Sequence, residues 1–337
     1  MVINSEFFMR LAIDEAWRFQ GLTYPNPAVG CTIVGENNAL LACEAHKKAG
    51  MPHAEVLALQ SAYFKLTKDE NILPLTNSHA IHKYLLENHN NIFSNISLYT
   101  TLEPCSHEGK TPSCASLISA LKIKKVYIAQ EDSNIIASNG IKILEENGIK
   151  VEKDILKDKA KELLEPFLLW KEKDRFVFFK WAQRLDGTID GGTISSKDSR
   201  KNVHAMRDRC DLLVIGGNTV RMDRPTLDAR LACGDAPDIL IYSKHKNFDM
   251  TIPLFNIEGR KVFIENNFTR LNDYKNIMIE GGGSMFLATK DIVNYYLCYI
   301  ATKTGGENNF FKSKENFTIL NIEQNSKDLI MWIKRKQ

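Results

Sequence analysis

Four residues in the first half of the chain have the types and spacing of a catalytic metal site. His53, Cys105 and Cys114 offer one imidazole and two thiolates, which are ligands that suit Zn²⁺. Three protein ligands leave the fourth tetrahedral position open to water, as in catalytic zinc sites. Glu55 follows two residues after His53 and can exchange protons with that water without binding the metal. The sequence therefore predicts a zinc site that activates water.

The residues around these ligands indicate two helices that begin near the metal. An apolar run follows Glu55, and Pro112 precedes Cys114 as in the first turn of a helix. Because the backbone dipole there favours a thiolate, we expect Cys114 to ionise easily. His107 lies between the two cysteines and is a competing ligand. Taken singly, each cysteine could instead be a small core residue.

The composition indicates a globular protein with two ordinary domains. The chain has 337 residues, 44% of them hydrophobic, and no apolar run approaches the roughly 18 residues that span a bilayer. Its first residues lack the basic-then-apolar order of a secretory signal, and seven cysteines without a paired framework favour a reducing compartment. We therefore expect a cytoplasmic protein without a membrane partner. An excess of 44 basic over 41 acidic residues is too small to indicate nucleic acid.

The first half has the pattern of an α/β domain. Apolar spacing predicts a helix over 5–20 and strands over 31–34, 39–43, 96–100 and 126–130. The Asn-, His- and Lys-rich residues 60–95 are interpreted as a surface excursion that leaves the zinc site untouched, helical around 81–87 and otherwise loop-like or disordered. Residues 153–175 are charged and helix-prone. They form either the last helix of this domain or a segment that holds the second domain by contacting it.

The second half repeats short apolar runs that are typical of strands buried on both faces. These runs are 176–182, 212–215, 238–243 and 277–280. Two are followed by glycines, 216–217 and 281–283, where bare backbone amides can approach the phosphates of a nucleotide. A tight turn is the simpler interpretation, and the glycines do not form the Gly-x-Gly-x-x-Gly fingerprint of dinucleotide-binding proteins.

Several motifs resemble those of the bifunctional deaminase/reductases of riboflavin biosynthesis. Residues 101–114, with eight residues between Cys105 and Cys114, resemble the deaminase half, as do 25–30, 49–56 and 147–151. Residues 180–187, 217–220 and 280–282 resemble the reductase half. The resemblance implies an α/β protein with a cytidine-deaminase-like α/β/α domain over 1–152, a helical connector over 153–175 and a dihydrofolate-reductase-like domain over 176–337.

The resemblance also implies two reactions. A zinc-dependent deamination of a diaminopyrimidinone that carries a phosphoribosylamino group would precede an NADPH-dependent reduction of the ribosyl group to ribityl. His53, Cys105 and Cys114 would bind Zn²⁺, Glu55 would shuttle the proton, and Asn26 would line the pyrimidine pocket. The implied NADPH contacts are Ala182, Thr219, Asp223, Ser243, Gly282, Gly283 and Ser284. The implied substrate contacts of the reductase are Arg207, Leu227, Arg230 and Glu280. The partner is a small phosphorylated pyrimidine, and we expect a homodimer or higher homo-oligomer.

Physical reasoning on the second half leaves alternatives. Arg207 and Arg230 can each offer two parallel donors to a phosphate dianion, although surface salt bridges would use the same groups. The chain departs from the family by a short loop after Gly187, and by single changes at three positions. These are Arg184 for a small residue, Arg224 for an acidic residue and Thr302 for proline.

Two other functions are compatible with these departures. The first is a deaminase whose C-terminal half binds nucleotide or stabilises a dimer without reducing anything. The second is a nucleic-acid-binding protein with structural zinc. Glu55 argues against the latter, because a structural site closes with a fourth protein ligand and has no use for a carboxylate beside it.

Overall fold

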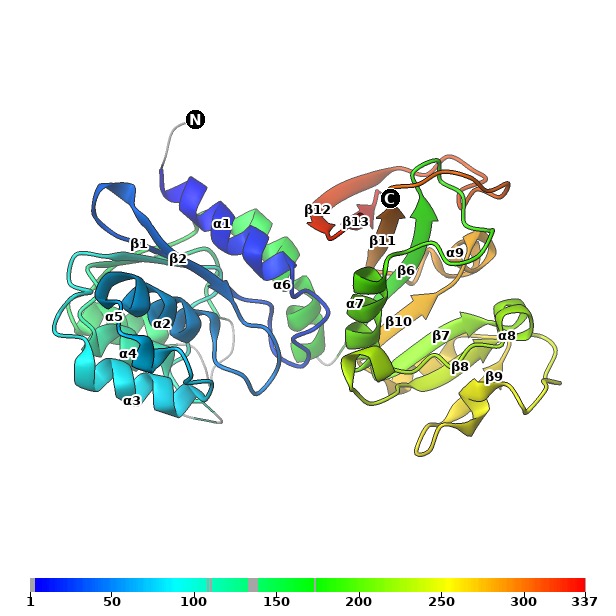
Figure 1. Ribbon diagram of the computed structural model, residues 1–337, viewed down its shortest axis with the longest axis horizontal. Coiled ribbons are helices and arrows are strands. Elements are labelled where there is room, and N and C mark those ends of the chain that lie inside the picture. Colours follow the sequence, from blue (N-terminus) through cyan, green and yellow to red (C-terminus); the bar gives the residue numbers. More distant parts are fainter. Residues whose placement is uncertain (1–3, 108, 110, 133–138, 173, 337) are drawn as a thin grey trace. The chain divides into compact units, whose positions relative to one another are not determined.

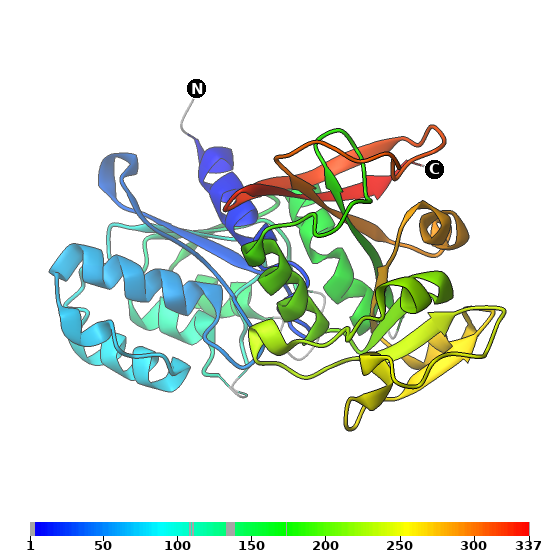
Figure 2. The ribbon, with the colours of Figure 1, turned by 45° about the vertical axis from the view of Figure 1, so that its right-hand side comes forward.

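The chain folds into two compact units, Met1–Phe167 and Leu168–Gln337 (Figure 1, Figure 2). The computed structural model describes residues 4–107, 109, 111–132, 139–172 and 174–336. Within these residues, no helix has both the length and the apolar character that crossing a membrane requires. Each unit is built around its own sheet.

The first unit alternates helices and strands. In chain order its elements are α1 (Ser5–Trp17), β1 (Gly30–Val34), β2 (Leu40–Ala45), α2 (Ala54–Thr67), α3 (Ser78–Asn88), β3 (Ser97–Thr100), α4 (Cys114–Ala120), β4 (Lys125–Ile128), α5 (Gly140–Glu146), β5 (Lys150–Glu152) and α6 (Lys157–Lys171). Its sheet has the order β2-β1-β3-β4-β5, in which β1 is antiparallel to β2 and β3 while β3, β4 and β5 are parallel. The helix and the four strands predicted for this half are confirmed, with small shifts of their ends.

Helices cover both faces of this sheet, because successive side chains of a strand point to opposite sides. Leu98 on β3 lies in the core formed with α2 and α4, whereas its neighbour Tyr99 contacts Phe8 of α1. Gly30 lets α1 approach β1 closely, since a Cβ at this position would lie 1.9 Å from the carbonyl oxygen of Ala12. The first unit is therefore an α/β/α sandwich.

The helix predicted around 81–87 is confirmed as part of α3. The interpretation of residues 60–95 as a surface excursion that is otherwise loop-like or disordered is wrong. Helix α2 continues to Thr67, and α3 then packs against α2 and α4. Ile72, Ile81, Leu85 and Phe93 are fully buried in the core of the unit. The error has a simple cause, because a few apolar side chains on one face are enough to bury a segment whose other residues are polar.

Helix α6 occupies the stretch predicted as a connector. Its Leu164 lies in the core of the first unit, and the carbonyl oxygen of Leu163 accepts a hydrogen bond of 2.6 Å from Gln20 Nε2. In its last turn, Trp170 donates from Nε1 to the carbonyl oxygen of Lys275, at 3.1 Å, within the second unit. The helix thus belongs to the first unit at its start and to the second at its end.

The second unit contains one large mixed sheet. Its elements are β6 (Phe176–Arg184), α7 (Lys197–Arg207), β7 (Leu212–Gly216), α8 (Gly217–Asp223), β8 (Asp238–Tyr242), β9 (Val262–Glu265), β10 (Asn276–Glu280), α9 (Gly283–Thr289), β11 (Tyr295–Ala301), β12 (Phe317–Asn325) and β13 (Asp328–Arg335). The strand order is β12-β13-β11-β6-β10-β7-β8-β9, and the six strands from β11 to β9 are parallel. The four predicted strands are confirmed, and β10 is buried along its whole length. Figure 1 shows these strands from β9, in yellow, to β12, in red.

The burial of one face of α3 predicts how substitutions in this helix change the stability of the first unit. Leu85→Ala should lower the free energy of unfolding of the first unit by about 2–5 kcal/mol, because it removes a fully buried side chain. Leu86, its neighbour, is 45% exposed, so Leu86→Ala should change stability by no more than about 0.5 kcal/mol. Urea titration followed by circular dichroism measures both variants. Equal losses would show that α3 does not pack as described.

Candidate active sites

Three metal-ligand side chains converge in the first unit. His53 directly precedes α2, Cys105 lies in the loop after β3, and Cys114 is the first residue of α4. The Nδ1 atom of His53 lies 3.6 Å from Sγ of Cys105 and 3.4 Å from Sγ of Cys114. Zinc bond lengths at tetrahedral angles require a nitrogen–sulfur separation of about 3.6 Å, so the donor set fits Zn²⁺. Among the described residues, His107 is not part of this cluster.

The two thiols of the cluster differ in acidity. The hydrogen bond from Cys114 lowers the pKa of Cys105 to about 4, and His53 acts in the same direction. The same hydrogen bond, together with burial, raises the pKa of Cys114 well above its usual value. In the thiol pair alone, donation to Cys105 and full burial favour the neutral form of Cys114. A bound Zn²⁺ would deprotonate both thiols, so the expectation that Cys114 ionises easily stays a prediction.

Neighbouring groups hold the ligands in place. The backbone N–H of Cys114 donates to Sγ of Cys105 at 3.4 Å, and Ser113 Oγ donates to the carbonyl oxygen of Cys105 at 2.9 Å. On the other side of the imidazole, Nε2 of His53 lies 3.3 Å from Oγ1 of Thr111. Such contacts fix the orientation of a metal ligand and its tautomer.

Glu55 lies beside the cluster in the first turn of α2. Its residue is only 4% exposed, and its carboxyl group is within hydrogen-bonding reach of the Cys114 thiol. Burial raises the pKa of Glu55 to about 7. A carboxyl group in this range can both accept and release a proton at neutral pH. The cluster thus has a buried acid–base group next to it.

Asn26 is connected to this site through a residue that the sequence analysis missed. His46, which directly follows β2, places Nε2 3.1 Å from Nδ2 of Asn26 and Nδ1 3.0 Å from the carbonyl oxygen of Pro52. Burial lowers the pKa of His46 to about 4, so the ring is neutral and accepts from the Asn26 amide. Its ring centroid lies 5.5 Å from that of His53. The sequence did contain a signal for His46, because this histidine closely follows a predicted strand and precedes His53 by seven residues.

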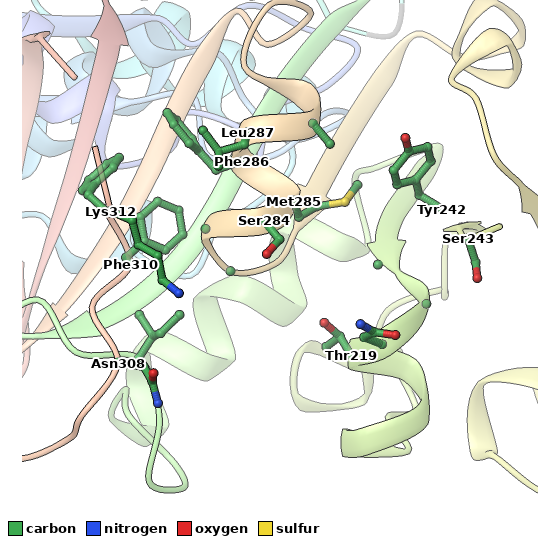
Figure 3. A pocket seen from close by; sticks show the side chains of 18 of the residues that line it. Thr219, Tyr242, Ser243, Ser284, Met285, Phe286, Leu287, Asn308, Phe310 and Lys312 are labelled. Atoms are coloured by element: carbon green, nitrogen blue, oxygen red, sulfur yellow. The ribbon is translucent and has the colours of Figure 1, made fainter. Parts of the chain in front are cut away.

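The second unit contains a cavity of about 630 Å³ at the carboxyl ends of its central strands. Five residues predicted to contact NADPH line it: Thr219, Ser243, Gly282, Gly283 and Ser284. Figure 3 shows Thr219 and Ser243 on one side of the cavity and Asn308 and Phe310 on the other. Ala182 and Asp223 are not among the lining residues, and Asp223 is exposed at the end of α8.

Glycine is required at the turn before α9. A Cβ on Gly281 would lie 2.6 Å from Cβ of Met285, and a Cβ on Gly283 would lie 2.3 Å from the carbonyl oxygen of Phe310. Both contacts are shorter than real Cβ atoms tolerate. The turn can therefore be this tight, and this close to the opposite wall, only with glycines.

The opposite wall joins two distant segments. Ile189 N–H donates to the carbonyl oxygen of Asn308 at 2.9 Å, and Phe310 N–H donates to that of Gly187 at 3.0 Å. Asp190 accepts from the backbone N–H groups of Glu307 and Asn308 at 3.0 and 3.1 Å. Arg184, buried beneath them, donates to the carbonyl oxygens of Asp190 and Gly191. The unusual arginine thus supports the shortened loop.

The other two departures also have partners. Arg224 donates to Asp249 at 2.6 Å and to Thr251 at 2.7 Å. Thr302 donates from Oγ1 to the carbonyl oxygen of Lys327 at 2.8 Å. Each unusual side chain is therefore part of the local structure.

A charged cluster lies at the end of β10. Arg207 Nε donates to Glu280 Oε1 at 2.8 Å, and Lys180 Nζ lies 3.4 Å from Glu280 Oε2. Burial opposes ionisation of Glu280, but Arg207 and Lys180 lower its pKa to about 2. Arg207 also donates to the carbonyl oxygen of Asp228 at 3.2 Å, next to the buried Leu227.

Two arginines predicted to contact the substrate already pair with carboxylates. Arg230 is largely exposed and pairs with Asp228 at 2.7 Å. Arg207 already uses Nε on Glu280, so only part of its guanidinium is available to a phosphate. Lys180 was missed, although it begins the 180–187 motif; its position on β6, next to β10, could have identified it.

Family models match both halves of the chain. The cytidine and deoxycytidylate deaminase zinc-binding region matches residues 3–130, and the RibD C-terminal domain matches residues 175–330. A riboflavin biosynthesis protein RibD of Aquifex aeolicus is 35% identical over 230 residues, covering 66% of this chain and 57% of that protein. The RibD of Bacillus amyloliquefaciens is 36% identical over 67% of this chain and 55% of its own length. The chain thus spans little more than half the length of these relatives.

Longer matches exist at lower identity. RibD of Mycobacterium tuberculosis is 29% identical over 87% of this chain and 84% of its own length. The crystal structure of a diaminohydroxyphosphoribosylaminopyrimidine deaminase/5-amino-6-(5-phosphoribosylamino)uracil reductase from Thermotoga maritima superposes with a TM-score of 0.63. That match has 26% identity and covers 98% of this chain and 99% of the other. The two α/β domains therefore have the folds that the resemblance implied, deaminase-like and then reductase-like.

Removal of one thiolate tests the metal cluster. Cys105→Ser should weaken zinc binding by more than about 100-fold, beyond the loss expected for a supporting residue, because one of three protein ligands is lost. Elemental analysis after chelator competition measures this. Cys233→Ser is the matched control, since Cys233 is exposed and far along the chain in the second unit. Stoichiometric zinc in Cys105→Ser would place the metal elsewhere.

Proposed function

The chain belongs to the family of bifunctional riboflavin-biosynthesis proteins, RibD, that join a deaminase domain to a reductase domain, and from this membership we propose that it catalyses both reactions. The substrate is the diaminopyrimidinone that carries a phosphoribosylamino group. Hydrolytic deamination comes first, and reduction of the ribosyl group to ribityl follows. The observation that carries this proposal is the meeting of His53, Cys105 and Cys114 beside the buried Glu55.

In the deamination, His53, Cys105 and Cys114 would hold Zn²⁺, which would supply a water molecule acidic enough to react near neutral pH. Glu55 takes a proton from the attacking water and delivers it to the amino nitrogen as the carbon–nitrogen bond breaks. Ammonia leaves and a carbonyl group remains on the ring. Asn26, held by His46, orients the pyrimidine for this attack.

In the reduction, NADPH would supply the hydride, and Thr219, Ser243 and Ser284, which line the cavity, would hold it. The glycine turn 281–283 packs tightly against Met285 and Phe310 at the border of this cavity. Arg207 and Glu280 face the substrate, with Leu227 and Arg230 nearby. Glu280 keeps its charge because Arg207 and Lys180 flank it, so it can accept hydrogen bonds from substrate hydroxyl or amino groups. Ala182 and Asp223 remain proposed cofactor contacts on resemblance alone.

The proposal also covers the compartment, the oligomeric state, the partners and the domain bounds. We propose a cytoplasmic homodimer or higher homo-oligomer that acts on a small phosphorylated pyrimidine, with neither nucleic acid nor membrane as a partner. Seven free cysteines are compatible with a reducing compartment. The domains are proposed as 1–152 and 176–337, with 153–175 between them.

The role of Glu55 is tested by substitution with its amide. Glu55→Gln should retain zinc, because Glu55 is not a ligand, and should abolish ammonia release, because an amide cannot shuttle the proton. Ammonia release from the diaminopyrimidinone substrate and zinc content measure the two effects. The same variant, given the deaminated product, should still oxidise NADPH. Full ammonia release would show that another group moves the proton.

The charged cluster is tested by Glu280→Gln. Loss of the carboxylate should slow NADPH oxidation by at least about 10-fold while ammonia release continues, because the cluster serves only the second reaction. Glu265→Gln is the control, since Glu265 ends the edge strand β9 and pairs with Arg270. Ammonia release without NADPH oxidation in the unmodified protein would instead favour a deaminase with a non-reducing second half.

A further inference from the structure

One end of the cofactor cavity is basic. Arg221, Lys244 and His245 line this end together with the hydroxyl-bearing Ser243. Ser243–His245 follow β8, and Arg221 lies one turn into α8. Lys244 and His245 are exposed and Arg221 is half-buried. A ligand bound here would therefore meet positive charge at the rim of the cavity.

Arg221 is held in one orientation before any ligand binds. Its Nη2 donates to the carbonyl oxygen of His245 at 3.1 Å and to Oγ of Ser243 at 3.4 Å. The guanidinium carbon lies 4.1 Å from the centroid of the Phe248 ring, so its face stacks on an aromatic side chain. A guanidinium fixed in this way loses little conformational entropy when it binds a phosphate.

The close contact of α8 with this arginine requires glycine. A Cβ on Gly217 would lie 2.7 Å from Oγ of Ser243 and 3.1 Å from Nη1 of Arg221. The first residue of α8 can therefore lie against both side chains only because it lacks a Cβ. Arg221, Gly217 and Ser243 all line the cavity.

No carboxylate opposes the positive charge. None of the described residues that line the cavity is Asp or Glu. The nearby Asp249 pairs with Arg224 at 2.6 Å, and in the described part of the chain no ion pair involves Arg221. Sites that select NADH place an acidic side chain on the 2′-hydroxyl of the adenosine ribose, whereas sites for NADPH place an arginine near the 2′-phosphate.

The strand order assigns this end to the adenosine half of the cofactor. Glu280 and its cluster end β10, where the substrate is proposed to bind, so the reacting ring of the cofactor must lie near β10. Ser243 follows β8, two strands further out in the order β10-β7-β8. Neighbouring strands are about 4.8 Å apart, so roughly 10 Å separates the carboxyl end of β10 from that of β8.

We propose that Arg221 is the residue by which this chain selects NADPH over NADH, with Ser243 and Lys244 completing a subsite for the 2′-phosphate. The proposal rests on the proposed function of the second unit. The observations that support it are the hydrogen bonds of Arg221 to Ser243 and His245 and its stacking on Phe248.

Nucleotide fragments test this subsite without turnover. Adenosine 2′,5′-bisphosphate and adenosine 5′-monophosphate differ only in the 2′-phosphate, and calorimetry gives the affinity of the full-length protein for each. The unmodified protein should bind the bisphosphate more tightly. Arg221→Ala should weaken bisphosphate binding by about 10- to 100-fold and leave monophosphate binding unchanged. Arg221→Lys should recover part of the loss, because it keeps the charge but not the planar fork.

The control is Arg224→Ala, which removes an arginine three residues further on that binds Asp249 and does not line the cavity. It should leave both affinities unchanged. Equal binding of the two fragments by the unmodified protein, or no effect of Arg221→Ala, overturns the inference while the proposed function stands. Failure of the unmodified protein to bind NADPH itself would instead overturn the cofactor cavity on which the inference rests.

Discussion

The first unit depends on bringing three donor atoms from three separate segments to within a few ångströms of one another. His53 is held at the start of α2, and Cys114 at the start of α4, with Cys105 between them in the loop after β3. Backbone hydrogen bonds fix that loop, because Thr101 N–H donates to the carbonyl oxygen of Gly30 and Glu103 N–H to that of Gln130. The central position of β3 in the sheet is thus what allows a metal site to exist.

The same loop also anchors α5. Glu103 is buried and accepts hydrogen bonds of 3.0 Å from the backbone N–H groups of Asp132 and Ile141. A Cβ on Gly140 would lie 1.9 Å from the carbonyl oxygen of Pro104, so the helix approaches the loop as closely as a glycine permits. The ligand loop is therefore braced from both sides, which keeps Cys105 in position.

Sequence reasoning predicted the features that depend on local pattern. The strands of both units and the cysteine–histidine cluster follow from apolar runs and from residue types that bind zinc. It failed for features that depend on partners distant in the chain. The burial of Ile81 and Leu85 and the engagement of Arg207 by Glu280 each arise from contacts that no spacing rule contains. His46 was missed for the same reason, since its importance comes from Asn26 and His53 being nearby.

The wall of the cofactor cavity has a consequence for biogenesis. Residues 186–190 are paired with residues 305–310, more than a hundred positions later in the chain. During translation, every residue of the first sheet has emerged long before that second segment is made. A nascent polypeptide can thus assemble its zinc-binding half early, while the nucleotide-binding half must wait until residues 305–310 have left the ribosome.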